Sequence, residues 1–185
     1  MKLNLGCGHN RLAGFVNVDA QAAANPDVVW DLEQTPWPWP DNSVSEARFI
    51  HSLEHMGADA RVFLAMIQEL YRVLEPEGSV VIHAPHPRHD NFLNDPTHVR
   101  IVTPTLFDLF DRELNDAWQA KGGANTPLAH YTGVNFKVAT VGALLDEPYA
   151  TQLREGTLTK AQVAEAERSR NNVVLEHRFT LVAKK

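Results

Sequence analysis

The sequence has few of the features that would point to a secreted or membrane protein. Its 185 residues include a single cysteine, Cys7, so no disulfide can form within the chain. No apolar run comes near the roughly 20 residues needed to cross a membrane. The first residues, "MKLNLGCG", lack the apolar stretch and cleavage site of a secretory signal. We therefore expect a cytoplasmic protein with no membrane partner.

The sequence also has no excess of positive charge. It carries 17 lysines and arginines against 23 aspartates and glutamates, a net charge of −6. Because a nucleic-acid surface needs a basic patch, we expect no nucleic-acid partner. No internal repeat and no linker divides the sequence, and its length suits one core. The sequence thus predicts a single domain over residues 1–185.

Hydrophobic patterning predicts short strands that alternate with loops and helices. The predicted strands are residues 2–5, 15–18, 28–30, 47–50, 79–84, 135–145 and 173–183. The predicted helices are residues 60–74, 105–113 and 158–170. Such alternation is typical of an α/β fold with a mostly parallel sheet.

Polar or glycine-rich residues follow each of the first five predicted strands. In chain order they are "GCG", Asp19, Asp31, "HSLEH" and "PHPRHD". Ligands of parallel α/β sheets bind outside the carboxyl ends of the strands. The sequence therefore predicts a ligand site at this edge of the sheet.

The first glycine turn and the two aspartates narrow the kind of ligand. Gly6 and Gly8 let backbone amides approach a ligand, although a plain tight turn explains them too. Residue 11 is Arg11 where a dinucleotide fingerprint has its third glycine, and only residues 6–15 separate the first two strands, which disfavours NAD and FAD. Asp19 suits the vicinal diol of a ribose and Asp31 an adenine amino group; a turn or helix cap is the alternative for each.

Four segments carry a resemblance to a known family. "LNLGCGHNRLAGFVNVD", "WDLEQTPWPWPDNSV", "ARFIHSLEHM" and "LYRVLEPEGSVVIHAP" resemble class I S-adenosylmethionine-dependent methyltransferases, in particular small bacterial ones with a shortened first helix. The resemblance covers about residues 1–110. It implies a Rossmann-like methyltransferase fold: a mostly parallel seven-stranded sheet with an antiparallel last strand and helices on both faces. It also implies S-adenosyl-L-methionine as cofactor and S-adenosyl-L-homocysteine as product.

The resemblance implies which residues contact this cofactor. The glycine loop lies against its methionine part, the acid after the second strand holds the ribose, and the residues after the third strand flank the adenine. The implied contacts are Asn4, Gly6, Cys7, Gly8, Asp19, Ala20, Asp31, Leu32, His51 and Ser52. The family usually has an acid where this chain has Asn4. That departure leaves open a second interpretation, a methyltransferase fold that binds a ligand or partner without catalysis.

Histidines supply the candidate catalytic groups. Methyl transfer to a hydroxyl or a protonated nitrogen is helped by a base, and histidine titrates near neutral pH. We expect His55, His86 and His98 to act as the base or to face the substrate, under a covering segment of about residues 86–133. The resemblance implies a small polar acceptor, in particular a sugar, methylated on O or N. The sequence leaves the oligomeric state open.

Two further patterns carry alternatives. The segment from residue 86 to 98 contains ligand types for zinc or iron, which would suit a metal-dependent hydrolase; the main interpretation has no metal. These ligand types are His86, His89, Asp90, Asp95 and His98. Trp37 and Trp39 of "PWPWP" either stack on the ring of adenine or of a substrate, or hold the loop together as a semi-exposed staple. We favour the semi-exposed staple.

Overall fold

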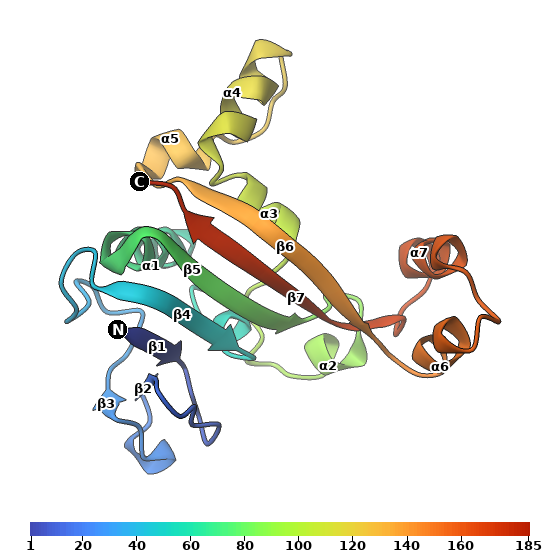
Figure 1. The fold of residues 1–185 in the computed structure, drawn as a ribbon, viewed down its shortest axis with the longest axis horizontal. Helices are drawn as coiled ribbons and strands as arrows, with labels where there is room; N and C mark the ends of the chain where they lie inside the picture. The colour runs from blue at the N-terminus through green and yellow to red at the C-terminus, as the bar shows by residue number, and fades with distance from the viewer.

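A single seven-stranded sheet forms the centre of the molecule in a computed structural model that describes residues 1–185 (Figure 1). Its strand order is β3-β2-β1-β4-β5-β7-β6. The strands are β1 (Lys2–Leu5), β2 (Val16–Asp19), β3 (Val28–Val29), β4 (Val44–Ile50), β5 (Leu74–Pro85), β6 (Phe136–Leu145) and β7 (Val174–Ala183). Strands β1 to β5 pair in parallel, and β7 runs antiparallel to both of its neighbours. The predicted mostly parallel sheet with an antiparallel last strand is confirmed.

Seven α-helices and two 3-10 turns connect the strands. They are η1 (Ala22–Ala24), η2 (Leu53–His55), α1 (Ala60–Val73), α2 (Asp90–Leu93), α3 (Pro104–Asp108), α4 (Arg112–Ala120), α5 (Leu128–Thr132), α6 (Tyr149–Arg154) and α7 (Lys160–Ser169). The helix predicted over residues 105–113 is wrong in extent. It ends at Asp108, and Asp111 starts α4 by accepting the N–H of Leu114 at 3.1 Å. No helix has both the length and the apolar character to span a membrane.

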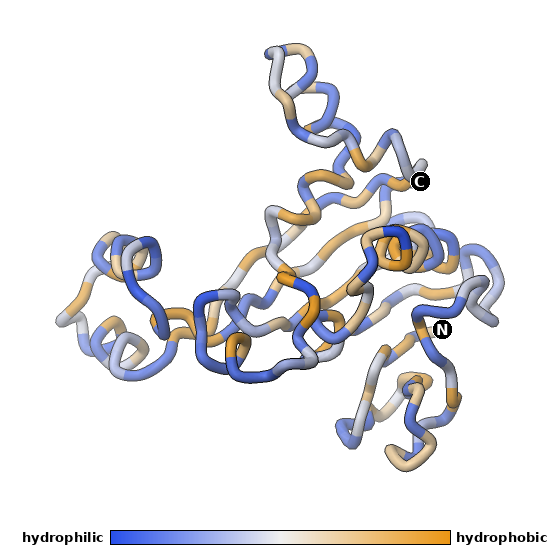
Figure 2. The backbone as a smooth tube through the Cα atoms, turned by 180° about the vertical axis from the view of Figure 1, so that it is seen from behind, coloured by the Kyte–Doolittle hydropathy of each residue, from blue (hydrophilic) through white to orange (hydrophobic).

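One face of the sheet holds the main core. Alternate residues of the strands, such as Leu3, Phe49 and Ile82, are buried on this face. Helix α1 packs its apolar stripe against them, and α3 covers the same face, where Phe107 lies 5.6 Å from Phe179 between ring centroids. Figure 2 shows this side of the molecule, with α1 in front of the strands. Burial of this face is the main source of stability.

The opposite face near β1 and β4 is covered by side chains of its own strands. Glu46 pairs with Lys2 at 2.8 Å and with Arg48 at 2.6 Å. The Arg48 guanidinium lies 4.7 Å from the centroid of the Phe15 ring, which belongs to the short connection between β1 and β2. The helical cover of the sheet is therefore uneven, and charged side chains line this part of it.

A polar network holds the first crossover, which has no helix. Asn4 donates from its side-chain amide to the carbonyl of Asn10 and to Oδ1 of Asn17, both at 2.9 Å. Asn17 donates in turn to Asp27 at 2.8 Å, and Arg11 pairs with the same carboxylate. Hydrogen bonds from Asn17, with the help of Arg11, lower the pKa of Asp27 to about 2. The network fixes β1, β2 and the glycine loop relative to one another.

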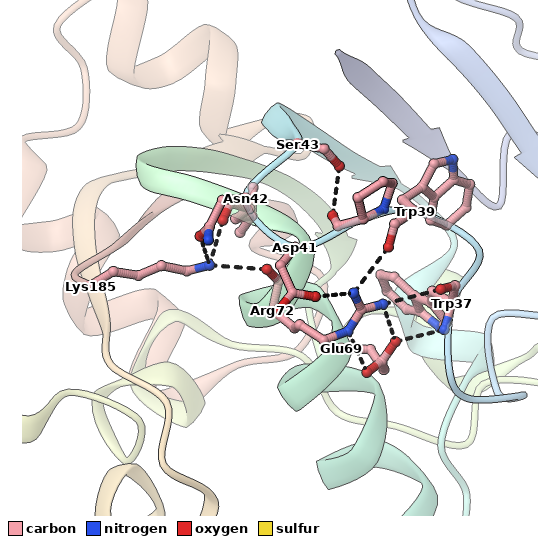
Figure 3. A network of polar contacts seen from close by, with 10 residues as sticks. Trp37, Trp39, Asp41, Asn42, Ser43, Glu69, Arg72 and Lys185 are labelled. Atoms are coloured by element: carbon pink, nitrogen blue, oxygen red, sulfur yellow. Dashed lines mark hydrogen bonds and ion pairs between the residues drawn. The ribbon is translucent and has the colours of Figure 1, made fainter.

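A second network fastens the loop between β3 and β4 to α1 (Figure 3). The guanidinium of Arg72 pairs with Glu69 at 2.7 Å and Asp41 at 2.6 Å, and it donates to the carbonyls of Trp37 and Trp39 at 3.1 and 3.0 Å. The side chains of Trp37 and Trp39 are 3% and 8% exposed and belong to the core. The two tryptophans hold the loop as predicted, but the prediction that they are semi-exposed is wrong, because both side chains pack into the core.

Candidate functional site

A cleft lies at the carboxyl ends of β1, β2 and β3, where the sequence predicts a ligand site. Its volume is about 400 Å³, within the range of small-molecule sites. It is lined by Gly6, Asp19, Ala20, Gln21, Trp30, Asp31, Leu32, Glu33, His55 and Met56. Half of the ten predicted cofactor contacts are therefore brought together here, from three separate loops: Gly6, Asp19, Ala20, Asp31 and Leu32.

Gly6, the first glycine of the loop, lies so close to another part of the protein that a larger residue would not fit there. Gly6 has φ +67°, and a Cβ on it would lie 2.6 Å from Cβ of Ser52. Ser52 in turn donates to the carbonyl of Leu5 at 2.8 Å, so the exit of β4 is locked against the exit of β1. Gly8 also has positive φ, +49°, but a Cβ there would meet open space. Its N–H donates to Asp19 at 2.8 Å and orients that carboxylate.

The two aspartates at the strand ends keep acceptor capacity toward the cleft. Asp19 accepts one backbone N–H on each oxygen, from Gly8 and from Gln21, both at 2.8 Å. Since a carboxylate oxygen has two lone-pair sites, each oxygen can accept one more donor. Asp31 is exposed and accepts the N–H of Glu33 at 3.0 Å. Both carboxylates can therefore bind hydroxyl or amino donors of a ligand.

Four residues that line the cleft are absent from the predicted set: Gln21, Trp30, Glu33 and Met56. The sequence predicts a third strand that includes Trp30, but the strand ends at Val29, and Trp30 lines the cleft. An aromatic residue at a strand end beside an acid is the signal that could have identified it. Glu33 accepts the N–H of Gly57 at 2.6 Å and ties the β3 side of the cleft to the segment after η2.

The other five predicted cofactor residues lie outside the lining: Asn4, Cys7, Gly8, His51 and Ser52. Asn4 is 2% exposed and its amide donates into the crossover network described above. Burial raises the pKa of the Cys7 thiol. Ser52 is buried beneath Gly6. Their predicted contacts with a cofactor stay predictions.

His51 lies between two buried carboxylates at the end of β4. Its backbone has φ +53°, and its Nε2 lies 2.6 Å from Glu176. The nearby carboxylate of Glu54, whose Oε1 lies 3.7 Å from Nδ1, and the negative charge of Glu176 raise the pKa of His51 above its usual value. The half-exposed imidazole therefore favours its charged form at this point of the sheet edge.

The three candidate catalytic histidines separate into two groups. His55 lines the cleft, and the ring of His98 lies 4.6 Å from it between centroids. His86 is 7% exposed, packs 4.8 Å from the ring of His177, and accepts the N–H of Arg88 at 3.2 Å. Burial, and next to it the charge of His177, lowers the pKa of His86 to about 4. The structure brings His55 and His98 together and leaves His86 outside the cleft lining, where its role stays a prediction.

The segment predicted to cover the substrate, residues 86–133, extends to both ends of the sheet. Its first part, through α2, lies beside the carboxyl ends of the parallel strands, while α4 and α5 lie near the opposite ends (Figure 1). The ligand types predicted in its first part also separate. His89 pairs with Asp146 at 3.0 Å and caps α2 through Asn91. Only His98 of that set belongs to a group with metal-ligand spacing.

Comparisons with known proteins identify the fold. No protein-family model matches the sequence, and no curated protein matches it. A SAM-dependent methyltransferase from Archaeoglobus fulgidus superposes with a TM-score of 0.64 at 18% identity, over 100% of this chain and 85% of that one. One from Methanosarcina mazei gives 0.56 at 12% identity, over 99% and 92%. The [4+2]-cyclase SpnF gives 0.54 at 16% identity, over 99% and 75%.

These similarities, with the strand order of the sheet, define the fold. The chain has the Rossmann-like fold of class I SAM-dependent methyltransferases. The implied fold is thereby confirmed. Since proteins of one fold host several activities, the activity is argued from the site.

Proposed function

We propose that this protein is a SAM-dependent methyltransferase that acts on an O or N atom of a small polar or sugar-like acceptor. The observation that carries the proposal is the cleft, which gathers Gly6, Asp19 and Asp31 from three strand ends. Asp19 has acceptor sites for a ribose diol, and the partly exposed side chain of Trp30 offers apolar surface for a flat ring. The residues present therefore fit an adenosyl cofactor.

When bound, S-adenosylmethionine supplies an electrophilic methyl group on a sulfonium. The protein's part is to hold an acceptor in line with that methyl group and to take up a proton where one is released. His55 is the histidine that lines the cleft, and His98 lies beside it. We assign these two side chains to the acceptor side. The net charge of −6 favours a small-molecule acceptor over a nucleic acid.

A second candidate function is ligand binding without methyl transfer. It is favoured by the likeness to a [4+2]-cyclase, an enzyme that is named for a cyclisation and not for a methyl transfer. Asn4 also stands where the family usually has an acid, and in this structure it serves the crossover network. The two candidates share the cleft and differ in turnover.

The test is calorimetric titration of the full chain with S-adenosylmethionine and S-adenosylhomocysteine. We expect binding, and we expect Asp19→Asn to weaken it about 10- to 100-fold, since a charge-assisted hydrogen bond is worth about 1.5–3 kcal/mol. The asparagine oxygen can still accept the N–H of Gly8, whereas its amide nitrogen cannot accept the N–H of Gln21, so the thermal midpoint of the variant is measured as well. Asp116→Asn, at an exposed carboxylate that pairs with His130 on α5, is the control. No binding at millimolar cofactor overturns the methyltransferase proposal; binding without turnover on any acceptor favours the second candidate.

A further inference from the structure

We propose that Glu54, His55 and His98 form a binding site for a divalent transition-metal ion beside the cleft. The three side chains each offer a ligand atom, and these atoms lie within 4.8 Å of one another. Two imidazoles and one carboxylate are a ligand set of zinc and of non-haem iron proteins. The set is distinct from the sequence-predicted ligands of the histidine-rich segment, with which it shares His98.

The site is assembled by long-range hydrogen bonds. Glu54 and His55 are adjacent in η2, whereas His98 comes from the connection between α2 and α3. The backbone N–H groups of Val99 and Arg100 both donate to the carbonyl of Glu54, at 2.9 and 3.0 Å. These two bonds clamp the chain on the C-terminal side of His98 to η2. The proximity of the three ligands is therefore a property of the backbone and does not depend on side-chain rotamers alone.

Hydrogen bonds set both imidazoles in the form that binds metals. Nδ1 of His98 lies 3.0 Å from the carbonyl of Phe92, which can only accept, so this nitrogen carries the proton. The Thr97 hydroxyl donates to Asp95 at 2.6 Å and therefore accepts from Nδ1 of His55 at 2.9 Å. In the neutral imidazole the lone pair is then on Nε2, which in His98 lies 3.7 Å from Oδ2 of Asp95. An acceptor on the far nitrogen is the arrangement that orients metal-binding histidines.

The third ligand is a buried carboxylate with an oxygen that has no partner. Glu54 is 1% exposed, and its Oε2 makes no hydrogen bond. Its Oε1 lies 3.7 Å from Nδ1 of His51, beyond hydrogen-bond distance. A buried carboxylate oxygen without a hydrogen-bond partner is unfavourable, and His51 lies near only the other oxygen of Glu54. A divalent cation shared with His55 and His98 would give Oε2 the partner that its present contacts do not provide.

The position of the ion has a consequence for the acceptor, and this consequence rests on the proposed function. Three protein ligands leave at least one coordination position for an outside oxygen. His55 belongs both to the ligand set and to the cleft lining, so that position lies near the cleft. A metal ion would lower the pKa of a coordinated hydroxyl, so that its proton could be released to water and His55 would not be needed as the base. The group that accepts the methyl is then a hydroxyl, which binds the metal through its oxygen, rather than an amine.

The test titrates Zn²⁺ into the chelator-treated full chain without S-adenosylmethionine, and records the absorption spectrum of the Co²⁺ form. We expect one ion per chain. Glu54→Gln and His98→Asn should each weaken binding by at least about 100-fold, more than the 10- to 100-fold loss typical of residues that only orient a ligand. His130→Asn, an exposed histidine on α5, is the matched control and should bind as the wild type does. Wild-type binding no tighter than that of Glu54→Gln overturns the proposal.

A second variant keeps the test decisive if a ligand substitution unfolds the chain. Thr97→Val retains all three ligands and removes the hydroxyl that orients His55. We expect a 10- to 100-fold weaker Zn²⁺ affinity and an altered Co²⁺ spectrum, with the thermal midpoint checked by circular dichroism. Unchanged affinity in Thr97→Val overturns the proposal. Cofactor titrations on the same preparations are separate, so failure to bind S-adenosylmethionine and failure to bind metal are told apart.

Discussion

The carboxyl edge of the sheet has two parts built in different ways. The β1–β3 side, from Gly6 to Glu33, consists of backbone turns and exposed carboxylates around an open cleft. The β4–β5 side, where His51, Glu54 and His55 lie, consists of histidines set against buried carboxylates. The first part satisfies its polar groups internally and keeps spare acceptors for a ligand. The second keeps a buried carboxylate oxygen without a hydrogen-bond partner, and the proposed metal site rests on this oxygen.

The largest expected effect on stability comes from a substitution at Gly6, where the β1–β3 side contacts the β4–β5 side. Gly6→Ala should destabilise the protein by about 3 kcal/mol or more, since strain at positive φ costs about 1–2 kcal/mol and overpacking against Ser52 adds about 1–3 kcal/mol. Gly14→Ala is the control because Gly14 has φ +80° but open space around it, so only the strain applies. Urea unfolding compares the two. Equal losses would show that the close contact with Ser52 contributes nothing.

Arg72 holds the loop after β3 against α1, and the β1–β3 side depends on this attachment. Arg72→Gln should cost about 2–3 kcal/mol, because charged hydrogen bonds to Glu69 and Asp41 are lost and Glu69 is left partly buried. Arg61→Gln on the same helix is the control. Its side chain is 92% exposed, so we expect a change within about 0.5 kcal/mol. Thermal unfolding measures both, and similar midpoints would contradict the anchoring role.

Asn4 tests whether the β1–β3 side needs the acid that is usual in the family. Asn4→Asp should destabilise the protein by about 1–2 kcal/mol, because a carboxylate cannot donate to Asn10 and Asn17. Asn94→Asp, at an exposed helix end, serves as the control. Denaturant unfolding gives the stability, and a cofactor titration accompanies it. Tighter cofactor binding in Asn4→Asp would show that the acid matters more than the network.

The smallest effect is a pH dependence on the β4–β5 side. His86 has a folded pKa of about 4, below the value of about 6.5 for an unfolded histidine. The unfolded chain therefore binds the extra proton first, and stability falls as the pH drops from about 6.5 toward 4. We expect about 1 kcal/mol less stability from this group at pH 5.5 than at pH 7.5. His86→Asn can still accept from Arg88 and should flatten the pH profile measured by urea unfolding; a profile as steep as that of the wild type would contradict the assignment.

The strands were predictable because their signals are local. A short apolar run such as residues 79–84 specifies a covered strand, and β5 (Leu74–Pro85) contains it. The helix over residues 60–74 was predicted to within one residue of Ala60–Val73, because its apolar spacing and the following Pro76 are both in the sequence. The break at Asp111 was missed, since a side chain that caps a helix looks the same in sequence as one on a helix surface.

The site was only partly predictable. Residues at strand ends, such as Asp19 and Asp31, can be found from sequence because parallel strands bring their carboxyl ends to one edge. The position of His98 beside η2 cannot be predicted from the sequence. It depends on two backbone hydrogen bonds between segments that are separated by more than forty residues. Asn4 is similar: its identity is explained by partners that come together only when the first crossover folds.

From the sequence came the strands, the glycine turn and the acids that follow them, because these depend on neighbours along the chain. Folding brought His55 and His98 together, left an oxygen of Glu54 without a partner and buried Trp37 and Trp39 while leaving Trp30 at the cleft. Those outcomes depend on burial and on pairing between distant segments. The sequence supplies the residues that take part, and tertiary packing determines which of them come into contact.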